Sequence, residues 1–513
     1  MAIRSILFGP GRPSAETEGV AEPEYFQDLN LDRIAEAVAK AGEDPGLVSC
    51  LRLPSRDVRL IGFRQEIFRN LEDPRVREAA ERFTAANARI RRRLELVGRM
   101  KHPPQANRWF LDLVLEHAAV VTALAEELEE AGATAPGLKA LCDDMAAYAR
   151  GDSLTRLRDQ ARDLRDRLEK TRYDLLLRGD KVTLARHDPE ARFDYIERVL
   201  ATFERFRTGT EEGPSPVRPP EPGLDRVEAG VLDLVVELFP DVFRDLAAFR
   251  AANGEFLPAD VVRAERELRF YLGYLAHLAP LREAGLPVCY PVVSATDKTL
   301  LARDVFDLAL AAERVRRGEP VVVNDVELSG AERVIVVSGP NQGGKTTFSR
   351  AFGQLYHLAA LGCPVPGSEV RVFLPDRIFT HYERAESLEG LTSKLEDELL
   401  RARAILDRAT SGSVIILNEI FTSTTADDAR ALSESLLASV SRLDALCLWV
   451  SFVDELSEAG LEAGSVVSMV GTVEAGEART YKMVRRPPDG RAYARTLVER
   501  HGLTRARLAE RIL

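Results

Sequence analysis

A glycine-rich stretch at residues 339–346 has the residue types and spacing needed to bind phosphate. It reads Gly-Pro-Asn-Gln-Gly-Gly-Lys-Thr and fits the pattern G-x-x-x-x-G-K-[ST]. Glycines let backbone N–H groups turn toward phosphate oxygens, and a helix that starts here would add the positive end of its dipole. We therefore expect ATP as cofactor. The residues expected to bind it are Gly339, Pro340, Asn341, Gln342, Gly343, Gly344, Lys345, Thr346 and Thr347.

The residues on either side favour the strand, loop and helix order that this loop requires. An apolar, β-branched run at 334–337 leads into it, and a helix-compatible run at 347–361 follows. A chance glycine-rich turn is the alternative, and the flanking strand and helix argue against it. Lys345 is expected to reach the outer phosphates as a catalytic residue, and Thr346 is expected to hold Mg²⁺.

A second apolar run, at 414–417, is followed by the polar residues Asn418 and Glu419. Ligands bind at the carboxyl ends of the strands in a parallel sheet, so Glu419 is expected to orient or deprotonate the attacking water. An exposed acid without function is the alternative. Asn418 is the second expected metal-site residue. Its amide accepts a hydrogen bond from a metal-bound water but has no charge, which predicts weaker Mg²⁺ binding or slower turnover.

The bulk composition limits the class of protein. With 513 residues, the chain is too long for one ordinary core. Its five cysteines are scattered without a C-x-x-C pair, which predicts a reducing, cytoplasmic location and no zinc module. No run of 18 apolar residues occurs, so we expect no membrane association. The net charge of −11 argues against general nucleic-acid affinity and leaves room for a local basic groove.

Periodicity divides the chain into mostly helical segments followed by an α/β domain. Two short strands are predicted at 173–177 and 182–185, around a hairpin turn, Gly179-Asp180. From residue 321 onward strands and helices alternate. The predicted domains are a flexible N-terminus (1–20), a helical core or lever (21–150), long helices with a small β-tip (151–207), a linker (208–223), a helical lever (224–318) and a P-loop ATPase domain (319–513).

Several separated blocks resemble the ATPase domain of the MutS family of DNA mismatch-repair proteins. Residues 337–347 are similar to that family's TGPNMGGKST, 362–366 to its G-x-x-V-P, 376–380 to its DRIFT segment and 417–420 to its LDEI. The blocks follow one another in order across about 319–513. The resemblance implies a P-loop NTPase fold of the ABC/MutS type, ATP hydrolysis with Mg²⁺, and DNA as a partner.

The amino-terminal half is similar to the same family over shorter stretches. Residues 25–72 look like its helical core or lever, and residues 152–206 look like a shortened clamp. The family's mismatch-reading domain, with its Phe-x-Glu wedge, has no counterpart in the sequence. We therefore expect a truncated MutS-like protein that lacks mismatch recognition.

Ser393 has two explanations that stay open. With Glu396 it fits a helix-capping box. The resemblance instead implies that it contacts the γ-phosphate bound by another subunit, which predicts a homodimer with composite ATP sites. Two positions depart from the family pattern. Phe452 stands in the segment where the family has a histidine, and Val321 stands where it often has an aromatic residue that stacks on adenine.

Basic residues gather in two stretches that could hold a nucleic-acid backbone. One lies at 89–101, and the other, at 156–172, has seven basic against four acidic residues. A solvated helix with internal ion pairs explains them equally well. The leading hypothesis is a dimeric MutS-like ATPase that moves helical levers on DNA. The alternatives are a nucleotide-gated scaffold with little hydrolysis, and a MutS-like ATPase that acts on RNA or ribosomes.

Overall fold

The computed structural model describes residues 3–9, 20–178, 181–187, 224–383, 394–453, 456, 464–473 and 479–487. No helix in these ranges is long and apolar enough to cross a membrane. Four predicted features lie outside the described residues: the Gly179-Asp180 turn, the second clamp helix expected within 192–206, the linker at 208–223, and Ser393.

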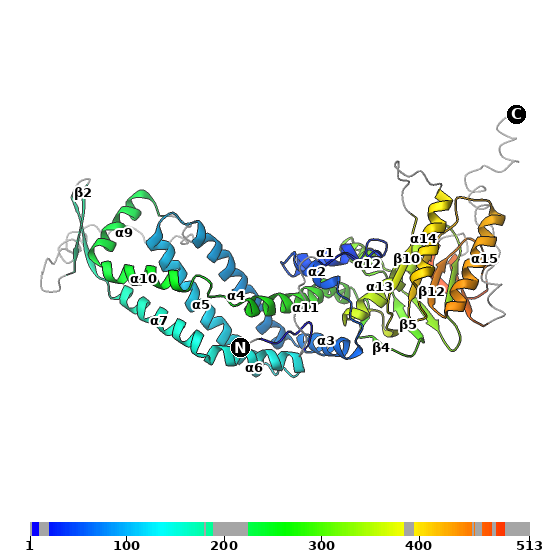
Figure 1. Cartoon of the computed structure of the whole chain (residues 1–513), viewed down its shortest axis with the longest axis horizontal. Coiled ribbons are helices and arrows are strands. Elements are labelled where there is room, and N and C mark those ends of the chain that lie inside the picture. The colour runs from blue at the N-terminus through cyan, green and yellow to red at the C-terminus, as the bar shows by residue number, and fades with distance from the viewer. Residues whose placement is uncertain are drawn as a thin grey trace, which may run out of the picture. The chain divides into compact units, whose positions relative to one another are not determined.

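The first of two compact units is helical and comprises Met1–Ile3, Glu78–Gly132 and Ala140–Glu265 (Figure 1). Its core is built from buried side chains of α5, α7 and α10, with Phe110 and Leu246 among the most buried. The helices that lie wholly or partly in it are α4 (Pro74–Arg99), α5 (Pro103–Glu130), α6 (Pro136–Arg150), α7 (Asp152–Glu169), α9 (Arg226–Leu238), α10 (Pro240–Ala252) and α11 (Ala259–Glu283).

A two-stranded hairpin follows α7 in this unit, as the alternation of residues predicts. Strands β1 (Tyr173–Arg178) and β2 (Lys181–Arg186) are antiparallel, and Tyr173 pairs with Arg186. At the end of the hairpin near α7, Arg186 Nη2 donates a hydrogen bond to the carbonyl oxygen of Leu238 over 2.7 Å.

The second unit comprises Arg4–Arg77, Ala133–Lys139 and Arg266–Leu513. The helices up to Arg77 therefore share a unit with the P-loop, which differs from the predicted division at residue 319. Helical periodicity shows which face of a helix is buried but not which domain buries it. Its helices, besides parts of those above, are α1 (Leu31–Ala41), α2 (Leu47–Leu51), α3 (Val58–Leu71), α12 (Leu308–Arg316), α13 (Lys345–Leu361), α14 (Lys394–Arg408) and α15 (Ala426–Leu443).

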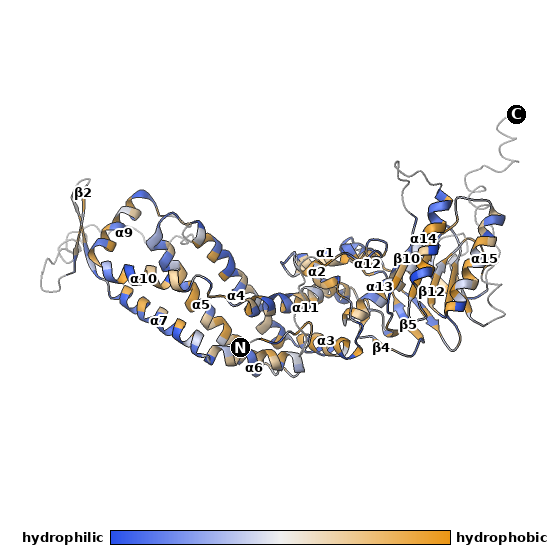
Figure 2. Cartoon of the chain, in the orientation of Figure 1, coloured by the Kyte–Doolittle hydropathy of each residue, from blue (hydrophilic) through white to orange (hydrophobic). Residues whose placement is uncertain are grey.

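Among the described residues, six strands form a sheet in the order β10-β11-β12-β7-β13-β14. All neighbours are parallel except β13 and β14. The strands β7, β11 and β12 are buried along their whole length and largely hydrophobic, as expected for a sheet covered on both faces (Figure 2). The bounds are β7 (Val334–Ser338), β10 (Ile378–His381), β11 (Val414–Asn418), β12 (Leu446–Val450), β13 (Val466–Val473) and β14 (Arg479–Arg485).

A smaller sheet corrects the prediction of a helical lever up to residue 318. Four strands pair in the order β4-β9-β5-β6, and β3 pairs with β8. The strands β3, β4 and β5 fall in residues 288–305, so the α/β architecture begins before residue 319. These strands are short and partly charged, which hides their alternation. The bounds are β3 (Val288–Cys289), β4 (Val292–Ser294), β5 (Leu300–Val305), β6 (Asn324–Leu328), β8 (Val365–Pro366) and β9 (Glu369–Phe373).

The amino-terminal stretch 1–20, predicted to be flexible, is packed at residues 3–9. Ile6 is buried, and its backbone N–H donates to a carboxylate oxygen of Glu267 over 2.7 Å. The hydroxyl of Ser5 donates to the other oxygen of the same carboxylate, also over 2.7 Å. A buried carboxylate that accepts several hydrogen bonds holds this segment in place.

Helix α13, which follows the P-loop, is buried almost throughout and binds the segment that precedes α1. Gln354 Nε2 donates to the carbonyl oxygen of Leu29 over 2.9 Å, and Arg350 Nε donates to that of Asp28 over 3.0 Å. The helix that positions the P-loop is therefore tied to residues more than 300 positions earlier in the chain.

Candidate nucleotide-binding site

The P-loop joins the end of β7 to the first residue of α13, as predicted. Gly339 has a φ of +125°, and a Cβ there would lie 2.9 Å from the backbone nitrogen of Gly471 in β13. Gly344 precedes α13 with a φ of +92°. Both positions require glycine, because a side chain would clash with β13 at the first and would be strained at the second. Helix α13 begins at Lys345, two residues before the expected start.

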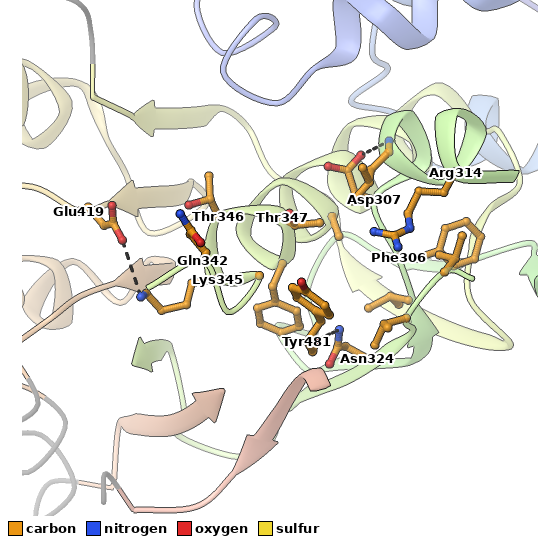
Figure 3. Close-up of a pocket in the computed structure, with 17 residues that line it drawn as sticks. Phe306, Asp307, Arg314, Asn324, Gln342, Lys345, Thr346, Thr347, Glu419 and Tyr481 are labelled. Atoms are coloured by element: carbon orange, nitrogen blue, oxygen red, sulfur yellow. Dashed lines mark hydrogen bonds and ion pairs between the residues drawn. The ribbon is translucent and has the colours of Figure 1, made fainter. Parts of the chain in front are cut away.

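Lys345 and Glu419 are brought together at the carboxyl edge of the sheet. The side chain of Lys345 is 4% exposed, and Nζ donates to the carbonyl oxygens of Gly339 and Pro340 over 3.0 and 3.2 Å. The same Nζ lies 3.8 Å from Oε1 of Glu419, and the two side chains face each other in Figure 3. The parallel pairing of β11, β12 and β7 produces this meeting, because their carboxyl ends share one edge.

A pocket of about 290 Å³ opens beside this pair, at the lower end of the size range of small-molecule sites. In Figure 3 Gln342, Lys345, Thr346 and Glu419 lie toward one end, and Phe306, Asp307 and Arg314 lie toward the other. The predicted residues that line it are Gln342, Gly344, Lys345, Thr346, Thr347 and Glu419. The lining residues that were not predicted as site residues include Phe306, Asp307, Leu310, Arg314, Val322, Asn324 and Tyr481.

The remaining predicted residues lie around this lining. Pro340 and Gly343 are buried within the P-loop, and Asn341 is exposed. Asn418, the last residue of β11, is buried, and its Oδ1 has no hydrogen-bond partner among the described residues. Buried polar atoms are rarely left unpaired. An unpaired amide oxygen next to Glu419 fits a site that accepts a hydrogen bond from a water on a bound Mg²⁺.

Those parts of the chain that the structure describes contain no cluster of three or more acidic, histidine or cysteine side chains that could hold a metal ion. A Mg²⁺ ion does not need such a cluster, because it is usually held by one or two protein groups together with substrate phosphates and waters. Thr346 and Asn418 supply two oxygen atoms of this kind.

The loop after Glu419 is held by a buried carboxylate that sequence reasoning did not find. Glu398 of α14 is 5% exposed and accepts hydrogen bonds from the backbone N–H of Phe421 and from the hydroxyl of Ser423, at 3.3 Å. Burial raises the pKa of the Glu398 carboxyl. Glu419 and Phe421 have φ values of +54° and +60°, which are uncommon away from glycine and cluster at functional sites.

Tyr481 of β14 also lines the pocket and was also missed. Asn324 fixes this part of β14, because Nδ2 donates to the carbonyl oxygen of Tyr481 over 3.2 Å and Oδ1 accepts from the N–H of Met483 over 2.7 Å. The backbone φ of Tyr481 is +58°, and its ring lies close to Gly344. Alternating residues indicate a strand at β14, but this pattern does not show which other strands β14 pairs with.

Asp307 is a structural member of the lining. Its buried carboxylate caps α12 by accepting from the N–H of Ala309 over 3.0 Å, and it accepts from Gln354 Nε2 over 2.9 Å. Burial raises the pKa of this carboxyl, and the hydrogen bonds from Gln354 and the backbone oppose the rise. Oδ1 accepts both of these hydrogen bonds, and through them Asp307 holds α12 against α13 at the pocket wall.

The two departures from the family pattern are placed differently. Val321 lines the pocket, where Phe306, Phe348 and Tyr481 supply the aromatic side chains. Phe452 follows β12 and is 48% exposed, and its apolar ring cannot donate a hydrogen bond to phosphate.

Known proteins are similar to part of this chain. The family model of MutS domain V matches residues 335–509. The DNA mismatch repair protein MutS of Chlorobium phaeovibrioides is 34% identical over 168 residues, which cover 32% of this chain and 19% of that protein. The protein of the same name from Brevibacillus brevis is 31% identical over 169 residues, covering 33% and 20%.

A third similarity reaches further along the chain. The DNA mismatch repair protein MutS of Chlorobium phaeobacteroides is 27% identical over 289 residues, covering 55% of this chain and 30% of that protein. The matched region thus spans about a fifth to a third of the length of these relatives. The range matched by the family model includes the P-loop and β11. Over residues 335–509, about a third of its length, the chain is similar to domain V of the MutS family.

Proposed function

We propose that this chain binds ATP with Mg²⁺ in the pocket between the P-loop and the end of β11, and hydrolyses it. The approach of Lys345 Nζ to Glu419 Oε1, at 3.8 Å, is the observation that supports this most strongly. It places a cation for the phosphates and a base for water at one point of the sheet edge. The similarity to DNA mismatch repair proteins supports the same reaction.

Each polar side chain of the site has a separate role in the transfer of the phosphoryl group to water. Lys345 neutralises charge on the outer phosphates, and Glu419 orients a water molecule and accepts its proton. Thr346 and Asn418 hold Mg²⁺, the latter through a bound water. When bound, this ion offsets the negative charge that develops on the phosphate oxygens.

Replacing Asn418 with aspartate is expected to lower the Mg²⁺ concentration needed for half-maximal hydrolysis by roughly fivefold. A charged acceptor binds a polarised water more strongly than an amide, by about 1 kcal/mol. A Mg²⁺ titration of ATP hydrolysis measures the change. An unaltered Mg²⁺ dependence in this variant would remove Asn418 from the metal site.

Replacing Tyr481 with alanine is expected to weaken ATP binding about tenfold, because base–aromatic stacking contributes roughly 1–3 kcal/mol. Replacing it with phenylalanine should preserve affinity, since the ring is kept. Equilibrium binding of a fluorescent ATP analogue and of ATP by competition measures both. Equal losses in the two variants would show that the hydroxyl or the fold matters and not the ring.

DNA is the proposed partner of the helical unit. The relatives are named for DNA mismatch repair, and residues 89–101 are rich in basic side chains. Arg89 and Arg93 both pair with Glu116, at 2.8 Å, so part of this charge is already neutralised. The proposed contact is therefore to backbone phosphates, weak and sensitive to salt. A homodimer in which Ser393 of one subunit completes the other subunit's ATP site belongs to the same proposal.

A nucleotide-gated scaffold is the second candidate, and two observations favour it. Asn418 lacks the charge that supports Mg²⁺, and Phe452 supplies no hydrogen-bond donor. Such a protein would bind ATP and change conformation with little hydrolysis. RNA or ribosomes as the target is the third candidate.

Steady-state ATP hydrolysis with Mg²⁺, without and with homoduplex, mismatched and branched DNA, RNA and ribosomes, tests these candidates. Turnover that depends on Lys345 and changes with one DNA supports the proposed enzyme and identifies its substrate class. Stimulation by RNA or ribosomes alone supports the third candidate. ATP binding without turnover above that of the Lys345→Ala variant would replace the enzyme with the scaffold.

A further inference from the structure

Arg479 stands at the start of β14 and reaches the P-loop. Its Nη1 donates a hydrogen bond to Oε1 of Gln342 over 2.8 Å, and Gln342 lines the nucleotide pocket. Lys345 is the other cationic side chain that hydrogen-bonds to P-loop residues within the described ranges. In Figure 3 Gln342 lies with Lys345 and Thr346, at the end of the pocket away from Phe306.

The β13–β14 hairpin lies against the P-loop at two further points. At one, a Cβ on Gly339 would come within 2.9 Å of the Gly471 backbone in β13. At the other, a Cβ on Gly344 would lie 3.4 Å from the ring of Tyr481 in β14. Arg479 comes two residues before Tyr481 on the same strand. The position of Arg479 is therefore set by a hairpin that contacts the loop at its beginning, its tip and its end.

The charge of Arg479 is not neutralised by the described part of the chain. No carboxylate there lies within ion-pair distance of its guanidinium, and Gln342 offers only a neutral amide oxygen. Arg485, at the other end of the same strand, pairs instead with Glu332 and, at 3.7 Å, with Glu327. A guanidinium has five N–H donors and no acceptor, and the hydrogen bond to Gln342 uses one of them, beside a loop built for phosphate.

Gln342 is itself held in an unusual backbone conformation. Its φ is +59°, in the left-handed region that side chains other than glycine, asparagine and aspartate seldom adopt. Such residues occur preferentially at binding sites, where the surrounding structure maintains the strain. The conformation places a long amide side chain at the tip of the loop, where it orients Arg479.

We propose that Arg479 binds the outer phosphates of the nucleoside triphosphate as a second cation beside Lys345, with Gln342 as its positioning residue. This assignment rests on the proposed ATP binding. Lys345 is buried inside the loop, whereas Arg479 approaches from the partly exposed hairpin. The planar guanidinium can donate two parallel hydrogen bonds to phosphate oxygens, which a lysine cannot.

The test compares equilibrium dissociation constants for ATP, ADP and AMP in the whole chain and its variants. Arg479→Ala is expected to weaken ATP binding about tenfold, ADP binding less and AMP binding not measurably, since AMP has no outer phosphate. Arg479→Lys should recover part of the loss, because it restores charge without the planar fork. Gln342→Ala should give an intermediate loss for ATP, since it frees Arg479 without removing it.

Arg485→Ala is the matched control, because it removes an arginine from the same strand that is already paired. Its ATP affinity should equal that of the wild type, and the melting temperatures should show that all variants are folded. ATP affinity within twofold of wild type in Arg479→Ala would overturn the assignment, as would an equal loss for AMP. If the wild type binds none of the three nucleotides, the proposed function itself fails, and this assignment fails with it.

Discussion

Replacing Lys345 with alanine is expected to weaken ATP binding by about a hundredfold and to abolish hydrolysis. The Lys345 side chain is 4% exposed, and its ammonium group lies between the carbonyl oxygens of Gly339 and Pro340 and the carboxylate of Glu419. Each hydrogen bond to a charged group contributes about 1.5–3 kcal/mol, and 1.4 kcal/mol is a factor of ten in affinity. Without the cation, the phosphates would also meet the uncompensated charge of Glu419.

Calorimetric or fluorescence titration with ATP measures this loss. Lys298→Ala is the matched control, because that lysine pairs with Asp444 at 2.6 Å and does not line the pocket. It should bind ATP like the wild type. Retention of full ATP affinity by Lys345→Ala, with the fold intact, would show that the nucleotide binds elsewhere.

Replacing Glu419 with glutamine should leave ATP binding within a few-fold of wild type and reduce turnover by a factor of roughly 10²–10⁴, the usual contribution of a general base. The amide keeps the size and hydrogen-bonding reach of the carboxylate but cannot accept a proton. The structure supports this separation, because Glu419 approaches the P-loop at Lys345 Nζ, over 3.8 Å, which is longer than a direct hydrogen bond. Single-turnover hydrolysis and ATP binding are measured side by side.

Glu434→Gln serves as the control for this change. Glu434 lies on α15, where it accepts a hydrogen bond from Arg430 Nε over 2.9 Å, and it is absent from the pocket lining. Its turnover should equal that of the wild type. If Glu419→Gln also turns over like the wild type, any hydrolysis does not use this carboxylate and the scaffold candidate is favoured.

The phosphate end of the site could be predicted from the sequence because its geometry follows from local rules. A β-branched run, a glycine loop and a helix are contiguous, so β7 and the start of α13 are visible as a pattern at 334–361. The meeting of Lys345 with Glu419 follows from one further rule, that parallel strands end at a common edge. The structure agrees with both.

The contribution of β14 to the site could not be predicted, because it depends on strand pairing over long separations. Tyr481 and Arg479 reach the P-loop only because β14 pairs with β13, and β13 pairs with β7. The Arg479–Gln342 hydrogen bond joins residues 137 positions apart. Alternation in a short strand carries no information about its neighbours in the sheet. The strands at 288–305 were missed because they are short and partly charged, so the sequence shows no clear alternation there.

The ties between α13 and the segment before α1 have a consequence for the order in which the chain can fold. The carbonyl groups of Asp28 and Leu29 accept hydrogen bonds from residues 322 and 325 positions later. During synthesis, the amino-terminal helices of this unit emerge from the ribosome long before α13 exists. Until α13 has been synthesised, these helices lack the partner that they contact in the folded unit. This protein should therefore depend on chaperones during translation more than its helical content suggests.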